Sequence, residues 1–286
     1  SVPTPAAPPF QFDTSDSALR HNEALLQASD FNIEALLRNH QNTTLGYGSE
    51  FRPVEQLRSI LGSHPHFTTL EVILRNGMDY RFHTQLSEPE RTTELTEMID
   101  RGNHKSADDE PSVVNQLLLK DVTHGFSLPL PPEMIIRIHG ALVQPLGLAK
   151  QWSLNQHGDR IPKYRLTQDL SFSISQDACS VNDRIDMKQY AEMIYGWCLG
   201  RILHFIAALR LAHPRQRIFI AKYDYSDAYR RIAHSGTAAA QSISIFDNVA
   251  YVALRLTFGG SPNPPPWRLF LSRIPIYPRR RIDTLR

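Results

Sequence analysis

The first third of the chain has the spacing of apolar residues that predicts short helices. Between residues 18 and 39, leucines and isoleucines recur three or four positions apart, which predicts two helices with Asp30 as the cap between them. Residues 54–61 have the same spacing and are followed by Gly62, a residue that commonly ends helices. We expect a helical region over this part of the chain.

The helical pattern continues to about residue 119. A capped amphipathic helix is predicted from about Pro89, followed by an acidic loop, and residues 112–119 predict a further helix. Residues 1–17 are rich in proline and are expected to be a disordered lead-in. Residues 18–110 are therefore expected to form a helical accessory region in which no chemistry can be recognised.

The second half changes to a mixture of strands and helices. Residues 126–149 combine proline with short β-rich pieces. Residues 187–212 predict a long helix, interrupted near Gly200, with a buried face. The residues expected on that face are Met193, Ile194, Trp197, Leu199, Ile202, Phe205 and Leu209.

A strand and a hairpin are predicted after this helix. The strand runs through residues 217–224, and the hairpin pairs residues 241–246 with 250–258 across the turn Asp247-Asn248. This order of elements predicts an α+β fold, in which an antiparallel sheet is covered by helices.

Charge is divided unevenly along the chain. Residues 1–149 hold 11 Lys or Arg and 19 Asp or Glu, whereas residues 150–286 hold 20 and 10. The basic half is expected to face an anionic partner, for which the phosphates of a nucleic acid are the first candidate. The alternative is that the two halves neutralise one another across an interface.

Composition narrows the class of protein. Cys179 and Cys198 are the only cysteines, too few for a disulfide framework or a four-cysteine zinc site. No apolar run has the length of about 20 residues that a membrane helix needs. The sequence begins at Ser1 without a basic-then-apolar leader, so we expect an intracellular protein without a membrane partner, read from a fragment or a processed segment.

The most informative acid is Asp224, in the run Ile218–Tyr229 (IFIAKYDYSDAY). It ends an apolar strand and precedes a polar turn, so its carboxylate can project into a cleft and bind Mg²⁺ through oxygen. The alternative is an ordinary Asp-capped turn. The spacing D-x-x-x-A-Y, from Asp224 to Ala228 and Tyr229, resembles the first palm motif of reverse transcriptases.

That resemblance implies a role for each matching residue. Asp224 is expected to bind two catalytic Mg²⁺ or Mn²⁺ ions, and the carbonyl of Tyr225 one of them. The backbone at Asp227 and Ala228 is expected to lie against the triphosphate. The ring of Tyr229 is expected beneath the sugar, where it would exclude a 2′-hydroxyl and so select deoxynucleotides.

Residues 254–267 (LRLTFGGSPNPPPW) resemble the second palm motif of the same family. Phe258 and Gly259 match its Phe-Gly pair, and Pro264 and Trp267 match its later proline and aromatic residue. Because glycine has no Cβ, its backbone can approach a base pair or a primer closely. A surface loop rich in proline and glycine is the alternative.

Residues 158–169 (GDRIPKYRLTQD) resemble the fingers β-hairpin of the family. Arg165 and Asp169 match its R-x-x-x-D, and Lys163 lies where a basic residue is common. These cations are expected to meet the incoming triphosphate, since a guanidinium can bond phosphate while its face stacks on a base. Arg160 is a further candidate, and Ser180–Asn182 (SVN) echoes the segment that closes this region.

The chain departs from the family in its last residues. The Tyr-x-Asp-Asp hairpin of the third palm motif is absent from the sequence, and the tail after Phe270 carries five arginines and one acid, Asp283. Of the palm-motif carboxylates that bind the two metal ions in this family, the given sequence therefore contains only Asp224. A truncated or frame-shifted copy is the simplest hypothesis, and an Arg-rich nucleic-acid-binding extension is the other.

The resemblance covers residues 140–270 and implies a partial right-hand polymerase of a retroelement. Fingers and an incomplete palm are expected over residues 111–270, followed by an irregular tail over residues 271–286. The implied function is RNA-directed DNA synthesis on an RNA or DNA template-primer with deoxynucleoside triphosphates, with activity doubtful for this chain alone. A non-catalytic nucleic-acid-binding remnant is the alternative.

Overall fold

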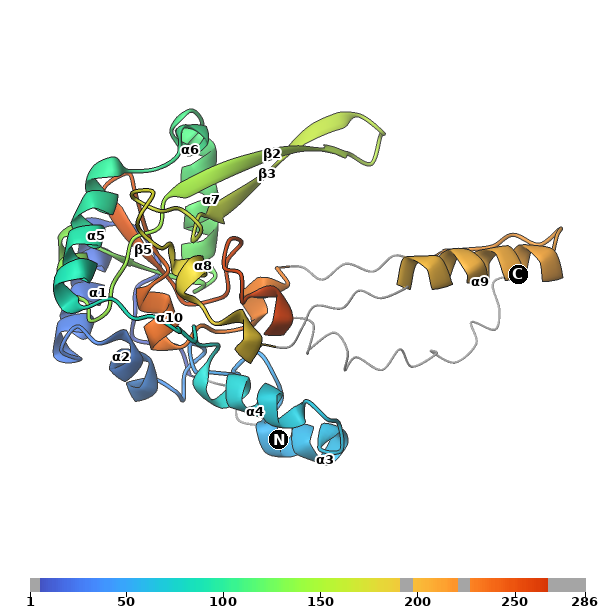
Figure 1. The fold of residues 1–286 in the computed structure, drawn as a ribbon, viewed down its shortest axis with the longest axis horizontal. Coiled ribbons are helices and arrows are strands. Elements are labelled where there is room, and N and C mark those ends of the chain that lie inside the picture. The colour runs from blue at the N-terminus through green and yellow to red at the C-terminus, as the bar shows by residue number, and fades with distance from the viewer. Residues whose placement is uncertain (1–5, 191–197, 221–226, 267–286) are drawn as a thin grey trace.

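The structure is a computed structural model that describes residues 6–190, 198–220 and 227–266 (Figure 1). Helices precede and surround a small antiparallel sheet, and a long two-stranded hairpin extends from the body. The chain is therefore mixed α+β with small antiparallel sheets, as the sequence predicts.

The helices of the first half lie close to the predicted ranges. They are α1 (Asp16–Ala28), α2 (Ile33–Asn39), α3 (Val54–Leu61), α4 (Phe67–Asn76), α5 (Glu88–Arg101), α6 (Lys105–Asp108) and α7 (Pro111–Thr123). Gly62 follows α3 as predicted, and Ser87 caps α5. Helices α4 and α6 were not predicted.

The second half of the described chain combines strands with helices, of which Cys198–Ala212 (α9) is the one long helix among the described residues. They are β1 (Ser127–Leu130), the 3₁₀ helix η1 (Pro132–Arg137), β2 (Leu146–Leu154), β3 (Arg160–Gln168), α8 (Val181–Arg184), η2 (Met187–Gln189), α9 (Cys198–Ala212), η3 (Tyr229–Arg231), α10 (Gly236–Ala240), β4 (Ile243–Phe246) and β5 (Val249–Ala253).

Strands β1, β5 and β4 form the central sheet, in that order and all antiparallel. The β4–β5 hairpin turns at Asp247 and Asn248, whose φ angles are +49° and +56°. Positive φ at both central residues is the requirement of a type I′ turn, which Asp and Asn tolerate. The predicted hairpin is confirmed.

One apolar cluster joins the N-terminal helices to this sheet. It includes Phe10 and Leu26 from the beginning of the chain and Leu128 and Ala250 from the sheet, all at most 6% exposed. The expected disordered lead-in is wrong for residues 6–17, because Phe10 is buried and α1 begins at Asp16. The helices of residues 18–110 thus share a core with the sheet.

The cap before the second helix is Asn32 and not Asp30. The Asn32 side chain accepts a hydrogen bond from the Ala35 amide at 2.9 Å, which satisfies a free donor of the first turn. Asp30 has a φ of +53° and belongs to the turn between the helices.

Helix α9 differs from the prediction for residues 187–212. It passes through Gly200 without interruption, and Leu199, Ile202 and Phe205 are 54–70% exposed, so the expected buried face is wrong for them. The helix lies apart from the central sheet, which it was expected to cover (Figure 1). Met193, Ile194 and Trp197 lie outside the described residues.

The predicted strand at residues 217–224 is only partly described. Ile218, Phe219 and Ile220 belong to no strand, and Phe219 and Ile220 are 86% and 72% exposed. Within the described residues, none of the helices has the length and hydropathy of a membrane span.

Candidate functional site

The β2–β3 hairpin presents a basic face. Lys163 and Arg165 pair with Gln151 and Ala149 across the ladder, and both side chains are exposed. Since side chains alternate along a strand, they lie on the face opposite to Tyr164 and Leu166, which pack against a cluster that includes residues of α7. The two predicted phosphate-binding cations thus share one solvent-facing surface.

An exposed tryptophan lies on the same hairpin between two cations. Trp152 is 57% exposed, and the Lys150 ammonium and the Arg160 guanidinium lie 5.6 and 5.3 Å from its ring centroid. A flat aromatic face flanked by positive charge is a surface on which a base can stack. The predictions did not include Trp152. Its position two residues after Lys150 places both on one face of a strand, and this spacing could have identified it as part of a basic surface.

The two segments that resemble palm motifs meet through their aromatic residues. The rings of Tyr229 and Phe258 make an edge-to-face contact, with centroids 5.2 Å apart and planes at 76°. Tyr229 also packs against the apolar cluster of α3 and α4, whereas Phe258 stays 43% exposed. Residues that were matched separately in the sequence are therefore neighbours in the fold.

Gly259 makes the closest backbone approach of this region. Its φ is +130°, and a Cβ built on it would lie 1.7 Å from the carbonyl oxygen of Gln168. Next to it, the Gln168 amide donates a 2.9 Å hydrogen bond to the Phe258 carbonyl. Only glycine fits here, because any side chain would overlap the backbone of β3.

The SVN segment joins the same turn. Asn182 Nδ2 donates to the Gly259 carbonyl at 2.9 Å, and its Oδ1 accepts from the Ser261 amide at 2.8 Å. Ser180 caps α8 by accepting from the Asp183 amide, which fixes the position of Asn182. The fingers-like segments and the Phe258–Gly259 turn are thus one hydrogen-bonded unit.

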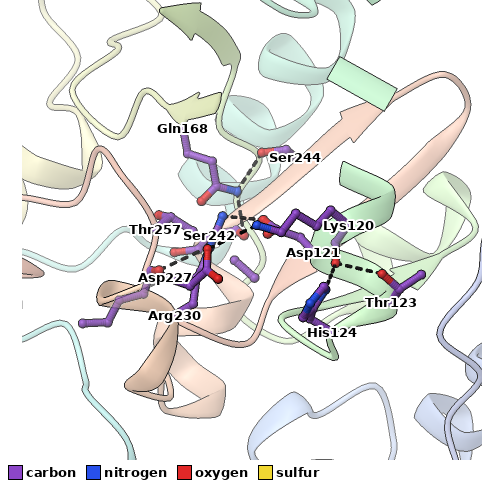
Figure 2. Close-up of polar contacts among 12 residues, drawn as sticks. Lys120, Asp121, Thr123, His124, Gln168, Asp227, Arg230, Ser242, Ser244 and Thr257 are labelled. Atoms are coloured by element: carbon purple, nitrogen blue, oxygen red, sulfur yellow. Dashed lines mark hydrogen bonds and ion pairs between the residues drawn. The ribbon is translucent and has the colours of Figure 1, made fainter. Parts of the chain in front are cut away.

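A cluster of alternating charges lies beside this unit (Figure 2). Lys120 Nζ lies 3.3 Å from Asp227 Oδ1, and Arg230 pairs with Asp121 while donating to the Leu256 carbonyl at 3.3 Å. Burial raises the pKa of Asp121, and the Arg230 guanidinium opposes that rise. The cluster attaches η3 to the end of α7.

The remaining candidates have separate outcomes. Asp224 and Tyr225 lie outside the described residues. Ala228 is the N-cap residue of η3, and its carbonyl accepts from the Arg231 amide at 3.3 Å. Asp169 faces His104, with Nε2 and Oδ2 2.9 Å apart, so its carboxylate stabilises the base of the hairpin.

The described acids beside the motif do not fit a metal ion. Asp121 and Asp227 each already contact a cation, and a metal would have to displace it. In the described part of the chain, which omits Asp224, no three His, Cys, Asp or Glu side chains form a metal-binding group.

Besides Trp152, sequence reasoning missed Asp121, Arg230 and Gln168, which build the site. Asp121 and Arg230 come from segments 109 positions apart, so no local pattern connects them. Gln168 gave a weak signal, because it is a polar residue on the strand face that Tyr164 and Leu166 make apolar.

Comparison with known proteins gives no relative: no family model, curated protein or solved structure matches the chain.

Proposed function

We propose that residues 111–270 are the fingers and the first part of the palm of an RNA-directed DNA polymerase. On this proposal they bind a template-primer and a deoxynucleoside triphosphate. The observation that supports it best is the contact of Tyr229 with Phe258, because it joins two motifs that the resemblance places at one nucleotide. The attachment of Gly259 to Gln168 and Asn182 adds the fingers-like segments to the same place.

The described side chains divide the work of binding. The exposed cations Lys163 and Arg165 hold phosphates, and Tyr229 supports the sugar. The backbone of the Phe258–Gly259 turn lies against the base pair, while the side of Gly259 that lacks a Cβ faces the Gln168 carbonyl. Binding of Mg²⁺ or Mn²⁺ at Asp224 and the Tyr225 carbonyl is part of the proposal and rests on the resemblance alone.

A second candidate function is nucleic-acid binding without catalysis. The basic hairpin favours it, since Lys150, Arg160, Lys163 and Arg165 lie on two paired strands that carry the exposed Trp152.

Primer extension separates the two functions. The chain is incubated with an RNA template, a DNA primer, the four deoxynucleotides and Mg²⁺ or Mn²⁺. Extension that Asp224→Asn abolishes supports polymerase activity. Salt-sensitive RNA binding without extension supports the binding function. The absence of both overturns the proposal.

Removing the basic face tests the binding roles directly. We expect the double variant Lys163→Ala/Arg165→Ala to weaken nucleotide binding about tenfold, because two phosphate contacts are lost. Its salt dependence of template-primer binding should also become shallower. The measurement is fluorescence anisotropy with a fluorophore-labelled dATP and with a labelled RNA–DNA template-primer.

The matched control is Arg20→Ala/Lys188→Ala, which removes one exposed Arg and one exposed Lys away from the hairpin. It lowers the net charge equally, so it should leave nucleotide affinity within about twofold of wild type. Equal losses in both double variants would show that bulk charge, and not the hairpin face, attracts the ligand.

A further inference from the structure

Gln168 is a buried polar residue at the last position of β3. Its side chain is 7% exposed, and Nε2 donates to Ser244 Oγ at 2.8 Å and to the Ser242 carbonyl at 3.1 Å (Figure 2). Both acceptors lie at or beside β4. These bonds therefore attach the exposed β2–β3 hairpin to the central sheet.

The backbone of the same residue holds the Phe258–Gly259 turn. Its amide donates to the Phe258 carbonyl at 2.9 Å, and its carbonyl oxygen occupies the space that a Gly259 side chain would need. Gln168 is thus attached to the sheet by its side chain and to the second palm motif by its backbone.

The oxygen of the Gln168 carboxamide has no hydrogen-bond partner among the described residues. Among the described residues, Gln168 Oε1 and Thr257 Oγ1 are buried without a partner. Both residues line a cavity of about 20 Å³ together with Asp121 and Arg230. That oxygen is desolvated without a compensating bond, so the carboxamide stabilises the fold through the two bonds of Nε2.

The Gln168 carboxamide also helps to fix the register of β3. A slip of one residue in β3 would turn Lys163 and Arg165 toward α7 and bring Tyr164 and Leu166 to solvent. A directional bond from Gln168 to Ser244 disfavours such a slip, because only one register places the amide beside the hydroxyl.

We infer that Gln168 is a positioning residue, which holds the Lys163 and Arg165 face of the hairpin at a fixed place relative to the Tyr229–Phe258 pair. This inference rests on the proposed function for its ligand, a deoxynucleoside triphosphate that the two parts contact together. Gln168 itself acts through the turn and the hairpin.

The test compares two buried glutamines. Gln168→Met keeps the length of the side chain and removes its hydrogen bonds. Gln144→Met is the matched control, because Gln144 is 2% exposed and its Nε2 donates to the Gln241 carbonyl at 3.2 Å and not to β4 or to the Phe258–Gly259 turn. Each full-length variant is assayed with labelled dATP, with the template-primer, and by amide hydrogen exchange.

We expect Gln168→Met to weaken dATP binding about tenfold and template-primer binding less than twofold, since the loss of the two positioning bonds of one side chain costs about this much. Amide exchange of residues 258–261 should accelerate in this variant. Gln144→Met should change neither affinity more than about twofold and should leave exchange in the turn unchanged.

Two results would overturn the inference: equal effects of the two variants, or a parallel fall of both affinities in Gln168→Met. If wild type binds neither ligand, the proposed function fails. Amide hydrogen exchange then tests on its own whether Gln168 anchors the Phe258–Gly259 turn. Faster exchange in the turn of Gln168→Met alone then supports the anchoring role, and identical exchange in both variants overturns it.

Discussion

Two antiparallel hairpins of the described chain, β2–β3 and β4–β5, have opposite environments. In β4–β5 every residue of β5 is buried, whereas in β2–β3 the strands are buried at the base and exposed toward the turn. The buried hairpin forms the core of the sheet. The exposed one carries cations and an aromatic ring that the core does not use. A substitution should therefore affect folding in the first hairpin and ligand binding in the second.

The largest difference is expected from a buried charge. Val252→Asp places a carboxylate at a fully buried position of β5, and we expect it to lower the free energy of unfolding by more than about 4 kcal/mol. Leu154→Asp, at a position of β2 that is 65% exposed, should change it by less than about 0.5 kcal/mol. Urea denaturation of both variants is the measurement. Similar losses would contradict the contrast between the hairpins.

Two glycines with positive φ, Gly259 and Gly158, differ in what surrounds them. Gly259→Ala must overlap the Gln168 carbonyl and also strain a φ of +130°, so we expect a loss of about 3 kcal/mol in the free energy of unfolding. Gly158→Ala, in the turn of β2–β3, has a φ of +87° and no atom within 4 Å, and should lose only about 1 kcal/mol. Thermal unfolding ranks the two. An equal loss would mean that conformation alone, and not contact, requires Gly259.

The core around β5 should also be sensitive to acid. His234 is fully buried between the Ala253 carbonyl and the Tyr80 hydroxyl, and burial lowers its pKa to about 4, with Arg230 and Arg255 acting in the same direction. The folded state holds this imidazole neutral, whereas the unfolded chain binds a proton below about pH 6.5. The contribution of His234 to the free energy of unfolding is therefore fully present above about pH 6.5. It falls by up to about 3 kcal/mol as the pH drops to about 4.

Chemical denaturation between pH 4 and 7 measures this effect. The difference between wild type and His234→Gln isolates it from the titration of carboxylates. His157→Gln removes a histidine from the exposed turn of β2–β3 and should keep the wild-type dependence. A His234→Gln variant that keeps the full dependence would show that other groups cause it.

Much of the local structure could be predicted from the residues. Apolar spacing located α1, α3, α5 and α7, and Asp247-Asn248 located the turn of β4–β5. Errors arose where burial was inferred from apolar character. Leu199, Ile202 and Phe205 form a helix as predicted, but helical spacing cannot say whether a helix finds a surface to cover. Phe10 gives the opposite error, because a proline-rich segment was expected to lack order and one aromatic residue attaches it to the core.

Most helices of the first half, the β4–β5 hairpin with its turn, and the residue types available for binding could be read from the sequence alone, because these follow from local propensity and from the period of the apolar pattern. Only the tertiary structure decided which of them meet. Tyr229 touches Phe258, Gly259 lies against Gln168, and Arg230 pairs with Asp121, contacts that join residues 29 to 109 positions apart. Such contacts depend on how helices and sheet share one core, and no short stretch of sequence contains that information.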